Sequence, residues 1–414
     1  MRKVAASRIR LAVALVAALP VAWFAMAGAV ANVTQSGNPA MALRMNDRDP
    51  VALAQRGYAL LDQRGVARAS DADVVDYGKR SLETLALNGP ALQLLGTAKA
   101  AQGDADAARR LFELSHRMSR RDLGTQLWMI EDAVEREDVA AALVHYDVAL
   151  RVRRDSSQLL FPVLTAALED PTLRAPFVPY VDASVPWVGA FFRHAIRATE
   201  RPDALADIAV RAGGLPDTPE FRQENGLQSE LIARMVTLGQ YDAARRFYLS
   251  IDGAGPAIFR SAELNPATTD PRYAPLTWQL TRMDTVQTNA MRSSENGPMT
   301  LNSTLASATR GVLARKLMML PAGRYGFAAR QRVANDTSDA ELNWTVTCVN
   351  NDGQPGSAIW SGSTLLASES RAIEGQFVVP AGCTRQFVTA GGYGGSGVYG
   401  TDVAIDSVAL RPIR

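Results

Sequence analysis

The sequence has almost no excess of either charge. Its 414 residues contain 44 Lys and Arg against 42 Asp and Glu, which gives a formal net charge of +2 at pH 7. Proteins that bind nucleic acid through its phosphates concentrate positive charge on one surface. The near balance argues against nucleic acid as a ligand, and we expect none among the partners.

The sequence also lacks the common catalytic and metal-binding motifs. Its three histidines, His116, His145 and His194, are too far apart to form a metal pair on one helical face. No H-E-x-x-H, Walker A or G-x-S-x-G run occurs. Residues 392–397 match G-x-G-x-x-G but open no predicted helix, so we interpret them as a hairpin loop. We therefore expect no catalytic residue, no metal, no cofactor and no enzyme activity.

One long hydrophobic run stands at the N-terminus. Residues 11–31, LAVALVAALPVAWFAMAGAVA, carry no charge and follow the basic leader MRKVAASRIR. An apolar run of about 20 residues can cross a bilayer, and a basic leader stays on the cytoplasmic side. Scarce lysine beside abundant arginine and alanine indicates a bacterial chain. We predict a single-pass inner-membrane protein with residues 32–414 in the periplasm. The alternative is a signal peptide that is cleaved after Ala29-Val30-Ala31.

Cysteine is nearly absent. Cys348 and Cys383 are the only two, and both lie in the C-terminal part of the chain. An exported chain meets an oxidising compartment, where two neighbouring thiols pair. We predict a disulfide, which would stabilise the fold by roughly 3 to 4 kcal/mol in the chain-entropy model. Two buried free thiols are the alternative.

Residues 37–256 are rich in Ala, Leu and Arg, with apolar residues at helical spacing. One segment recurs within them. Residues 103–112, GDADAARRLF, return 136 positions later as residues 239–248, GQYDAARRFY, and this separation is four times 34. Ala142 falls on the same grid, 34 positions after Ala108. The repetition predicts an array of helical hairpins.

A period of 34 residues with small and aromatic positions resembles the tetratricopeptide repeat (TPR) family. In such a stack the small residue lets two helices approach closely, and the aromatic residue fills the gap to the next pair. Lys99, Ile130 and Ile232 depart from the family pattern, and prolines interrupt it between residues 155 and 225. Another kind of α-hairpin stack is the alternative. The resemblance assigns packing positions to Leu95, Gly96, Ala108, Phe112, Ala142, Tyr146, Ala244 and Tyr248.

A TPR-like solenoid offers an extended concave groove, which implies a protein or peptide partner. The alternative for any residue assigned to that groove is a solvated helix face. The residues that the resemblance places in the groove are Gln93, Thr97, Glu131, Glu135, Ser229 and Thr237.

The composition changes after Pro256. Residues 257–272 are interpreted as a linker, and residues 273–414 show short alternating runs between Gly- and Pro-containing turns. The run at 341–348, ELNWTVTC, alternates strictly and places Trp344 on a face that meets a core. About seven or eight such strands fit an antiparallel β-sandwich or jelly roll.

Two Pro-Ala-Gly turns separate predicted strands, at 321–323 and at 380–382, and we predict two strands around each turn. The last strand, residues 403–413, changes phase near Asp406, which suggests a β-bulge.

The LPAGRYGF and AIDSVAL runs in this region resemble carbohydrate-binding-module-like jelly rolls. The resemblance implies that a sugar ring stacks on aromatic side chains, although aromatic residues in sandwiches are more often packed in the core. Asp352, Glu374 and Asp402 could offer oxygens to calcium, but they lack a recognisable ligand spacing. The candidate glycan platforms are Trp278, Trp360, Tyr393 and Tyr399.

The sequence thus predicts a multidomain α plus β protein. It would have a tip and transmembrane anchor at 1–36, a TPR-like α-solenoid at 37–256, a linker at 257–272 and a jelly-roll sandwich at 273–414. The leading hypothesis is a membrane-anchored periplasmic scaffold that binds a protein partner, with envelope or exopolysaccharide assembly as its context by analogy. The alternatives are a lectin-like carbohydrate-binding protein, with polysaccharide as its partner, and a carbohydrate-active hydrolase, whose paired carboxylates no sequence pattern excludes.

Overall fold

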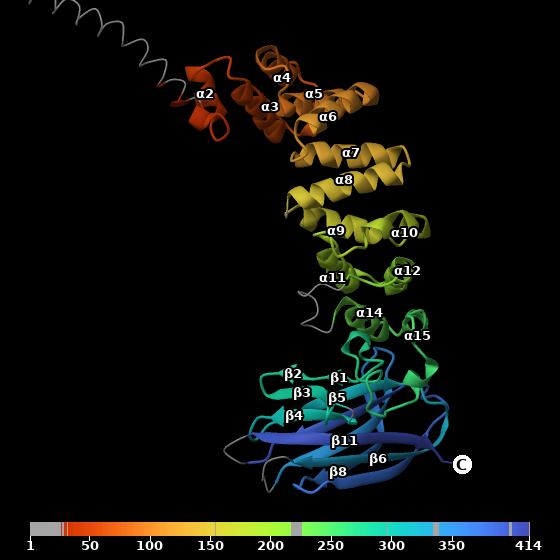
Figure 1. Cartoon of the computed structure of the whole chain (residues 1–414). Coiled ribbons are helices and arrows are strands. Elements are labelled where there is room, and N and C mark those ends of the chain that lie inside the picture. The colour runs from red at the N-terminus through yellow and green to blue at the C-terminus, as the bar shows by residue number, and fades with distance from the viewer. Residues whose placement is uncertain are drawn as a thin grey trace, which may run out of the picture. The chain divides into compact units, whose positions relative to one another are not determined.

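A helical N-terminal half and a C-terminal antiparallel β-sandwich make this an α plus β protein, as the sequence predicts (Figure 1). This computed structural model describes residues 26, 29, 30, 32–153, 155–216, 226–295, 297–333, 339–396 and 400–413.

The predicted single-pass inner-membrane location is corrected by the structure. Within the ranges given above, no helix combines the length and the apolar character needed to cross a bilayer. Most of the segment on which that prediction was based, residues 11–31, lies outside the described residues. The prediction was based on the apolar run and its basic leader. The single-pass location is therefore wrong, and the membrane is no longer counted among the partners.

The chain divides into two compact units, one up to Leu160 and one from Phe161 onward. Helices α3 and α4, α5 and α6, and α7 and α8 pack as successive hairpins in the first unit (Figure 1). Helix α9 runs across the division. The helices are α2 (Pro39–Met45), α3 (Pro50–Arg64), α4 (Ala72–Thr84), α5 (Gly89–Ala101), α6 (Ala105–Met118), α7 (Leu123–Glu135), α8 (Val139–Val152) and α9 (Ser156–Ala167).

Aspartate side chains begin several of these helices. Asp104, Asp122 and Asp138 each accept a hydrogen bond from the backbone N–H three residues later, at 3.1, 2.7 and 3.0 Å. Such a cap satisfies an N–H group that has no partner inside the helix, and it contributes about 1 kcal/mol. The short polar turns therefore determine where α6, α7 and α8 start.

Small and aromatic residues pack these hairpins together. A Cβ on Gly96 would lie 2.9 Å from the Phe112 ring, so glycine allows α5 and α6 to approach closely. Phe112 in turn stacks on Trp128 of α7 with 4.3 Å between the ring centroids. Leu95 packs instead on Gly78 of α4. The remaining assigned packing positions are buried: Ala108, Ala142, Tyr146, Ala244 and Tyr248. Membership of the TPR family stays a prediction.

The second unit begins with further helices and ends with the sandwich. Two short 3-10 turns, η3 (Pro256–Phe259) and η4 (Pro271–Tyr273), lie between the helices and the strands. The linker predicted at 257–272 falls inside this unit. The helices are α10 (Pro171–Phe177), α11 (Val188–Ala198), α12 (Pro202–Ala212), α14 (Gly226–Thr237) and α15 (Tyr241–Leu249).

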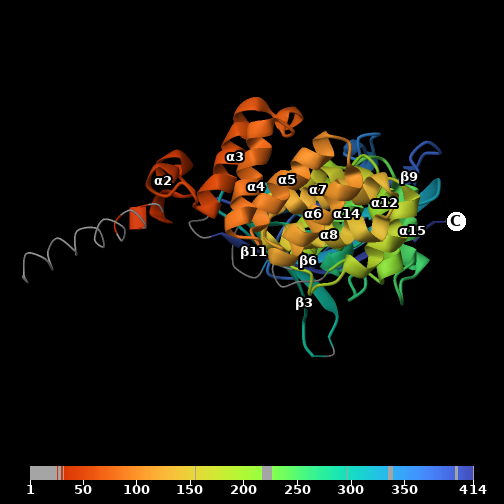
Figure 2. The same ribbon diagram turned by 90° about the horizontal axis from the view of Figure 1, so that it is seen from above.

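The sandwich consists of two sheets, with orders β1-β5-β10-β7-β8 and β2-β3-β4-β11-β6-β9, called sheet A and sheet B below. The β3–β4 hairpin extends away from the other strands (Figure 2). The strands are β1 (Gln279–Leu280), β2 (Arg282–Met283), β3 (Val286–Arg292), β4 (Met299–Leu305), β5 (Arg310–Met318), β6 (Gly323–Val333), β7 (Glu341–Val349), β8 (Pro355–Leu365), β9 (Arg371–Val379), β10 (Gln386–Tyr393) and β11 (Thr401–Pro412).

The last two strands complete both sheets. Strand β10 pairs with β5 and β7 in sheet A, and β11 pairs with β4 and β6 in sheet B. All pairings are antiparallel, and from β4 onward the chain changes sheet at every connection except β7–β8, as in a jelly roll. The predicted bulge in the last strand is confirmed, because the β11 register shifts between Ile405 and Ser407.

The strands around the two Pro-Ala-Gly turns exist, but they do not pair with each other. Strand β5 lies in sheet A and β6 in sheet B, and the turn at 380–382 likewise joins β9 in sheet B to β10 in sheet A. Each turn therefore carries the chain across the sandwich. A short turn between two strands is compatible with both arrangements, and the partner available to each strand decides between them.

The predicted disulfide is confirmed. Cys348 at the end of β7 is bonded to Cys383, which precedes β10, across a sequence separation of 35 residues. Trp344 faces the core as predicted, with 0 % of its surface exposed, and its indole N–H donates to Gln331 Oε1 at 2.8 Å.

One charged side chain points into the sandwich. Lys316 on β5 pairs with Val388, which faces the core, and it is completely buried. Its Nζ donates hydrogen bonds to the carbonyl oxygens of Ile258, at 2.7 Å, and of Leu276. This lysine therefore ties two loop segments to the sheet.

Burial lowers the pKa of Lys316 from its ordinary 10.5 to about 7. Between these values the unfolded chain holds a proton that the folded chain has released, so the free energy of unfolding rises with pH. We predict that the free energy of unfolding rises by up to about 1.4 kcal/mol per pH unit between pH 7 and 9.5. Exposed tyrosines stay protonated in this range, so they do not contribute to the slope. The check is denaturant unfolding of the wild type and of Lys316→Met at several pH values, monitored by tryptophan fluorescence. The variant should lose this slope, and parallel pH profiles would contradict the assignment.

Candidate functional site

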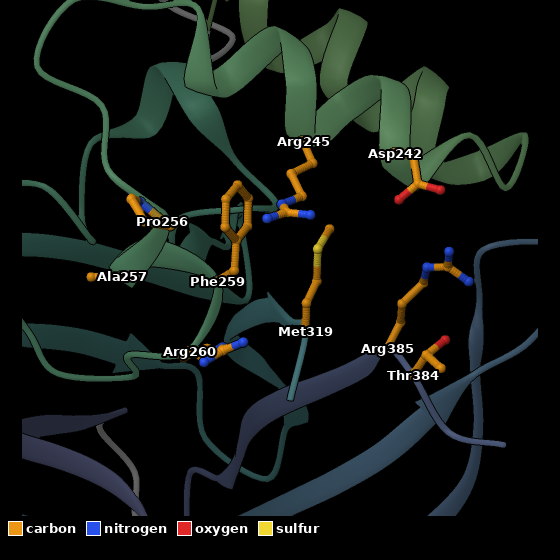
Figure 3. A pocket seen from close by; sticks show the side chains of 9 residues that line it. All are labelled: Asp242, Arg245, Pro256, Ala257, Phe259, Arg260, Met319, Thr384 and Arg385. Atoms are coloured by element: carbon orange, nitrogen blue, oxygen red, sulfur yellow. The ribbon is translucent and has the colours of Figure 1, made fainter. Parts of the chain in front are cut away.

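A cavity of about 690 Å³ lies in the second unit, between α15, the turn that contains η3, and the ends of β5 and β10. Figure 3 shows Arg245 and Arg385 extending from opposite sides into the space beside Met319, with Asp242 near Arg385. We call it the arginine pocket. Its lining residues are Asp242, Arg245, Pro256, Ala257, Phe259, Arg260, Met319, Thr384 and Arg385.

Helical spacing explains why α15 contributes two of these residues. The helix buries Tyr241, Ala244 and Phe247 against the rest of the unit. Asp242 and Arg245 are three residues apart on the other side, where side chains at i and i+3 are neighbours. The helix therefore presents one acidic and one basic group to the cavity.

Aromatic rings hold two of the arginines. The guanidinium carbon of Arg385 lies 4.1 Å from the centroid of the Tyr241 ring, and that of Arg245 lies 5.7 Å from the centroid of Phe259. A guanidinium placed over a ring keeps its N–H groups available at its edges. Across the part of the chain that the structure describes, Arg245, Arg260 and Arg385 form no ion pair within 4.0 Å. Three cations therefore share the cavity with one carboxylate.

The cavity walls are fastened to one another by backbone contacts. Met319 N–H donates to the carbonyl of Phe259 at 2.8 Å, which fixes the η3 turn to the end of β5. The Tyr241 hydroxyl donates to the carbonyl of Asn350 at 3.4 Å. A Cβ on Gly353 would lie 2.4 Å from the Val236 carbonyl oxygen, so the β7–β8 turn touches α14 directly. The cavity is thus built into the junction of helices and sandwich.

A second surface, the outer side of sheet A, is polar. Its side chains alternate along each strand with residues of the core, and the register aligns them in two rows across the sheet. We call it the polar face. One row is Gln279, Arg315, Thr389, Thr345 and Ser361, and the next is the exposed Val312, then Gly391, Asn343 and Ser363.

Most of these polar groups have no hydrogen-bond partner among the residues that the structure describes. The side chains of Asn343, Thr345, Thr389, Ser361 and Ser363 form no hydrogen bond with any other described residue. In the same rows, Arg315 donates from Nε to Gln279 Oε1 at 2.7 Å and lies over the buried Phe387 ring at 5.2 Å. The free groups are therefore available to a ligand, beside an arginine that is held in place.

The four predicted glycan platforms have different environments. Trp278 is completely buried and donates its indole N–H to the Ala262 carbonyl, so the prediction that it stacks on a sugar is wrong. Trp360 is half-buried and packs on Phe327, with 4.8 Å between the ring centroids, and against Gly375. Trp278, which precedes β1, belongs to the core, and Trp360 on β8 packs against that core.

Tyr393 lies at the end of the polar face. Arg310 covers its ring at 4.6 Å and approaches Glu341 at 3.9 Å. Tyr393 therefore remains a candidate, whereas Tyr399 lies outside the described residues.

The predicted groove residues divide between the two units. In the first unit Gln93 and Thr97 line a cavity of about 670 Å³, where the Tyr58 hydroxyl donates to Gln93 Oε1 at 2.5 Å. Burial raises the pKa of Tyr58 well above its usual range. Glu131 and Glu135 are exposed on α7.

In the second unit, Ser229 is buried and donates to the Ala274 carbonyl at 2.9 Å, and Thr237 is exposed. Ser229 therefore joins α14 to the start of the sandwich instead of facing a groove.

The three oxygen donors considered for calcium are not brought together. Among the residues that the structure describes, no group of three or more His, Cys, Asp or Glu side chains could hold a metal ion. Asp402 instead accepts a hydrogen bond from Thr304 at 2.7 Å.

None of the residues that line the arginine pocket was predicted from the sequence. The available signal was Arg245, which stands in the repeated DAARR run, but the residues opposite it come from distant parts of the chain.

Comparison with known proteins gives no family. No family model and no curated protein matches the chain. Among solved structures, TmCBM61 in complex with β-1,4-galactotriose is 15 % identical over 33 % of this chain and 88 % of its own, with a TM-score of 0.25. The CBM22-1 xylan-binding domain of Xyn10C from Paenibacillus barcinonensis is 12 % identical over 33 % of this chain and 86 % of its own, with a TM-score of 0.26. Similarities at this level carry no functional argument, and the jelly-roll assignment rests on the strand order.

The contact between Gly353 and α14 generates a prediction. Gly353 has φ +73°, and its added Cβ would meet backbone atoms of Val236 and Thr237 at 2.4 to 3.0 Å. We expect Gly353→Ala to lower the free energy of unfolding by about 1 to 3 kcal/mol, since neither strained backbone nor packed helix can relax easily. The matched control is Gly382→Ala, where nothing lies within 4 Å of the added atom. Equal denaturation midpoints for the two variants would show that the contact is absent.

Proposed function

We propose that this protein binds a saccharide chain on the polar face of its jelly-roll sandwich. The observation that carries the proposal is the set of hydroxyl and amide groups on β10, β7 and β8 of sheet A that have no hydrogen-bond partner among the described residues. A saccharide presents many hydroxyl groups along one edge, and each can both donate and accept hydrogen bonds. Rows of Thr, Ser and Asn side chains match that pattern.

The centre of the face is shaped by a glycine. A Cβ on Gly391 would lie 2.7 Å from Asn343 Oδ1 and 3.0 Å from Nδ2, so the amide lies directly over the Gly391 backbone. The Asn343 amide therefore lies close to the sheet, and neither its Oδ1 nor its Nδ2 has a hydrogen-bond partner among the described residues. A ligand can then lie flat across the strands.

The two ends of the face differ in character. Arg315, held by Gln279 and Phe387, supplies guanidinium donors at one end. The Tyr393 ring stands at the other end with one side covered by Arg310. An aromatic ring with one open side suits the apolar face of a sugar ring. The proposed activity is binding without turnover, and it corresponds to the lectin-like alternative rather than to the scaffold.

The proposal predicts that Asn343→Ala weakens saccharide binding by the full-length protein roughly threefold to tenfold, the value of one or two hydrogen bonds. Binding is measured by calorimetry with ligands identified on a glycan array. The control is Gln376→Ala, an exposed amide on sheet B. The saccharide should be recovered with its chain length unchanged.

Three results would count against this assignment. They are a blank array, equal loss of affinity in Gln376→Ala, and shortened saccharide products. The last would favour the hydrolase.

A second candidate function has one specific observation in its favour. Gln93 and Thr97, which the TPR resemblance assigns to a groove, do line a cavity together with Tyr58 and Gln55 in the first unit. We propose on this basis that the first unit can hold a segment of a partner protein.

Filling that cavity should block the partner. A protein partner identified by crosslinking from position Gln55 should no longer bind the Thr97→Trp variant, because the indole fills the cavity. It should be kept in Glu83→Ala, whose side chain is exposed on α4 outside the cavity lining. Retention of the partner by Thr97→Trp would remove the groove from consideration.

A further inference from the structure

The internal repeat places two arginines in equivalent positions with different surroundings. Residues 103–112 and 239–248 align without a gap, so Asp106 and Arg109 correspond to Asp242 and Arg245. Helices α6 and α15 both present this Asp–Arg pair three residues apart. The sequence therefore provides its own comparison for the arginine pocket.

In the first copy the arginine is neutralised. Arg109 approaches Asp106 at 2.8 Å and Asp132 of α7 at 2.7 Å. The Arg109 hydrogen bonds hold the pKa of Asp132 below its ordinary value. Asp132 is nearly buried and also pairs with Arg136 at 3.1 Å. This arginine therefore joins two helices.

In the second copy the arginine has no such partner. No α-helix follows α15 with a carboxylate at the position of Asp132, and within the described ranges Arg245 makes no ion pair. Instead Arg260 and Arg385 line the same cavity. Like charges brought together repel one another, so a group of three guanidinium ions is stabilised by an anion between them.

The rest of the lining indicates what kind of anion fits. The cavity measures about 690 Å³, within the range of pockets that hold organic ligands and far larger than an inorganic ion requires. Phe259, Met319 and Pro256 give part of the wall an apolar surface. A sugar ring with a carboxylate offers apolar C–H groups and a planar anion, which the guanidinium fork binds through paired hydrogen bonds.

The pocket and the polar face lie on the same side of sheet A, separated by the buried row Leu317, Phe387 and Thr347. Arg385 precedes Phe387 and Thr389 by two and four residues, and its carbonyl accepts from Val349 N–H at 3.0 Å in the β7–β10 register. Residues two apart on a strand share a side of the sheet. Arg385 therefore stands on the same side as Thr389, roughly 14 Å along the strand direction.

We propose that the arginine pocket binds the carboxylate of an acidic saccharide, that is, of a uronate unit. The inference rests on the proposed saccharide-binding function and specifies its substrate class. Arg245 and Arg385 hold the carboxylate, and Arg260 adds positive charge at the rim. Asp242 limits the affinity because it competes for the same cations.

The experiment compares short oligomers of galacturonate, glucuronate, mannuronate and guluronate with their methyl esters, which keep the rings and remove the charge. Binding to the full-length protein is measured by calorimetry. At least one acid should bind roughly tenfold to a hundredfold more tightly than its ester, the value of a charge-assisted hydrogen-bond pair.

The variants locate the effect. Arg245→Gln and Arg385→Gln should each remove the preference for the acid. Arg246→Gln is the control, because it makes the same charge change at the next residue of α15, outside the pocket lining. Asp242→Asn should tighten binding of the acid about threefold, and a misfolded variant could not produce such a gain.

Several outcomes would overturn the inference. If an ester binds as tightly as its acid while Asn343→Ala weakens both, the inference fails and the proposed function stands. If no acid or ester binds, both fail. If Arg246→Gln removes the preference as Arg245→Gln does, the effect is general surface charge. If inorganic phosphate displaces the acid at equal concentration, the pocket is a plain anion site.

Discussion

The stacking of Arg385 on Tyr241 joins the last helix to the sandwich, and the arrangement of the second unit depends on it. The interaction places the guanidinium of Arg385, which precedes β10, against the ring of Tyr241, the first residue of α15. The close approach of Gly353 to α14 reinforces the same junction. Tyr241 begins α15 and Arg385 directly precedes β10, so the stacked pair holds Arg385 in place at the cavity wall. A side chain that is already held in place loses little conformational freedom when it binds a ligand.

A buried lysine secures the other side of this junction. Lys316 is enclosed in the sandwich, and burial lowers its pKa to about 7, so that above this pH it is held as the neutral amine. The lysine donates to two loop carbonyls that would otherwise be left without partners. It thereby holds the connection between helices and strands against sheet A. The jelly roll and the preceding hairpin consequently form one unit, although their secondary structures differ completely.

This unit carries two kinds of surface. The polar face offers neutral hydroxyl and amide groups, and the arginine pocket offers concentrated positive charge. Hydrogen bonds distributed over many groups suit a flexible polar chain, whereas a charged pocket selects one chemical feature of it. Arg109, the residue equivalent to Arg245 in the first copy of the repeat, has a different role. There two carboxylates neutralise Arg109, and it serves helix packing.

Local sequence determined much of this protein. Periodicity gave the helical half and the strands, alternation along one strand turned Trp344 inward, and two lone cysteines paired as predicted. These features depend on neighbours in the chain. Tertiary structure decided the remainder: the Pro-Ala-Gly turns cross between sheets, Trp278 is buried under a loop, and Arg245 meets Arg385 from 140 residues away. Strand partners and pocket walls are chosen by contacts between distant segments, and a single sequence shows each residue without its spatial neighbours.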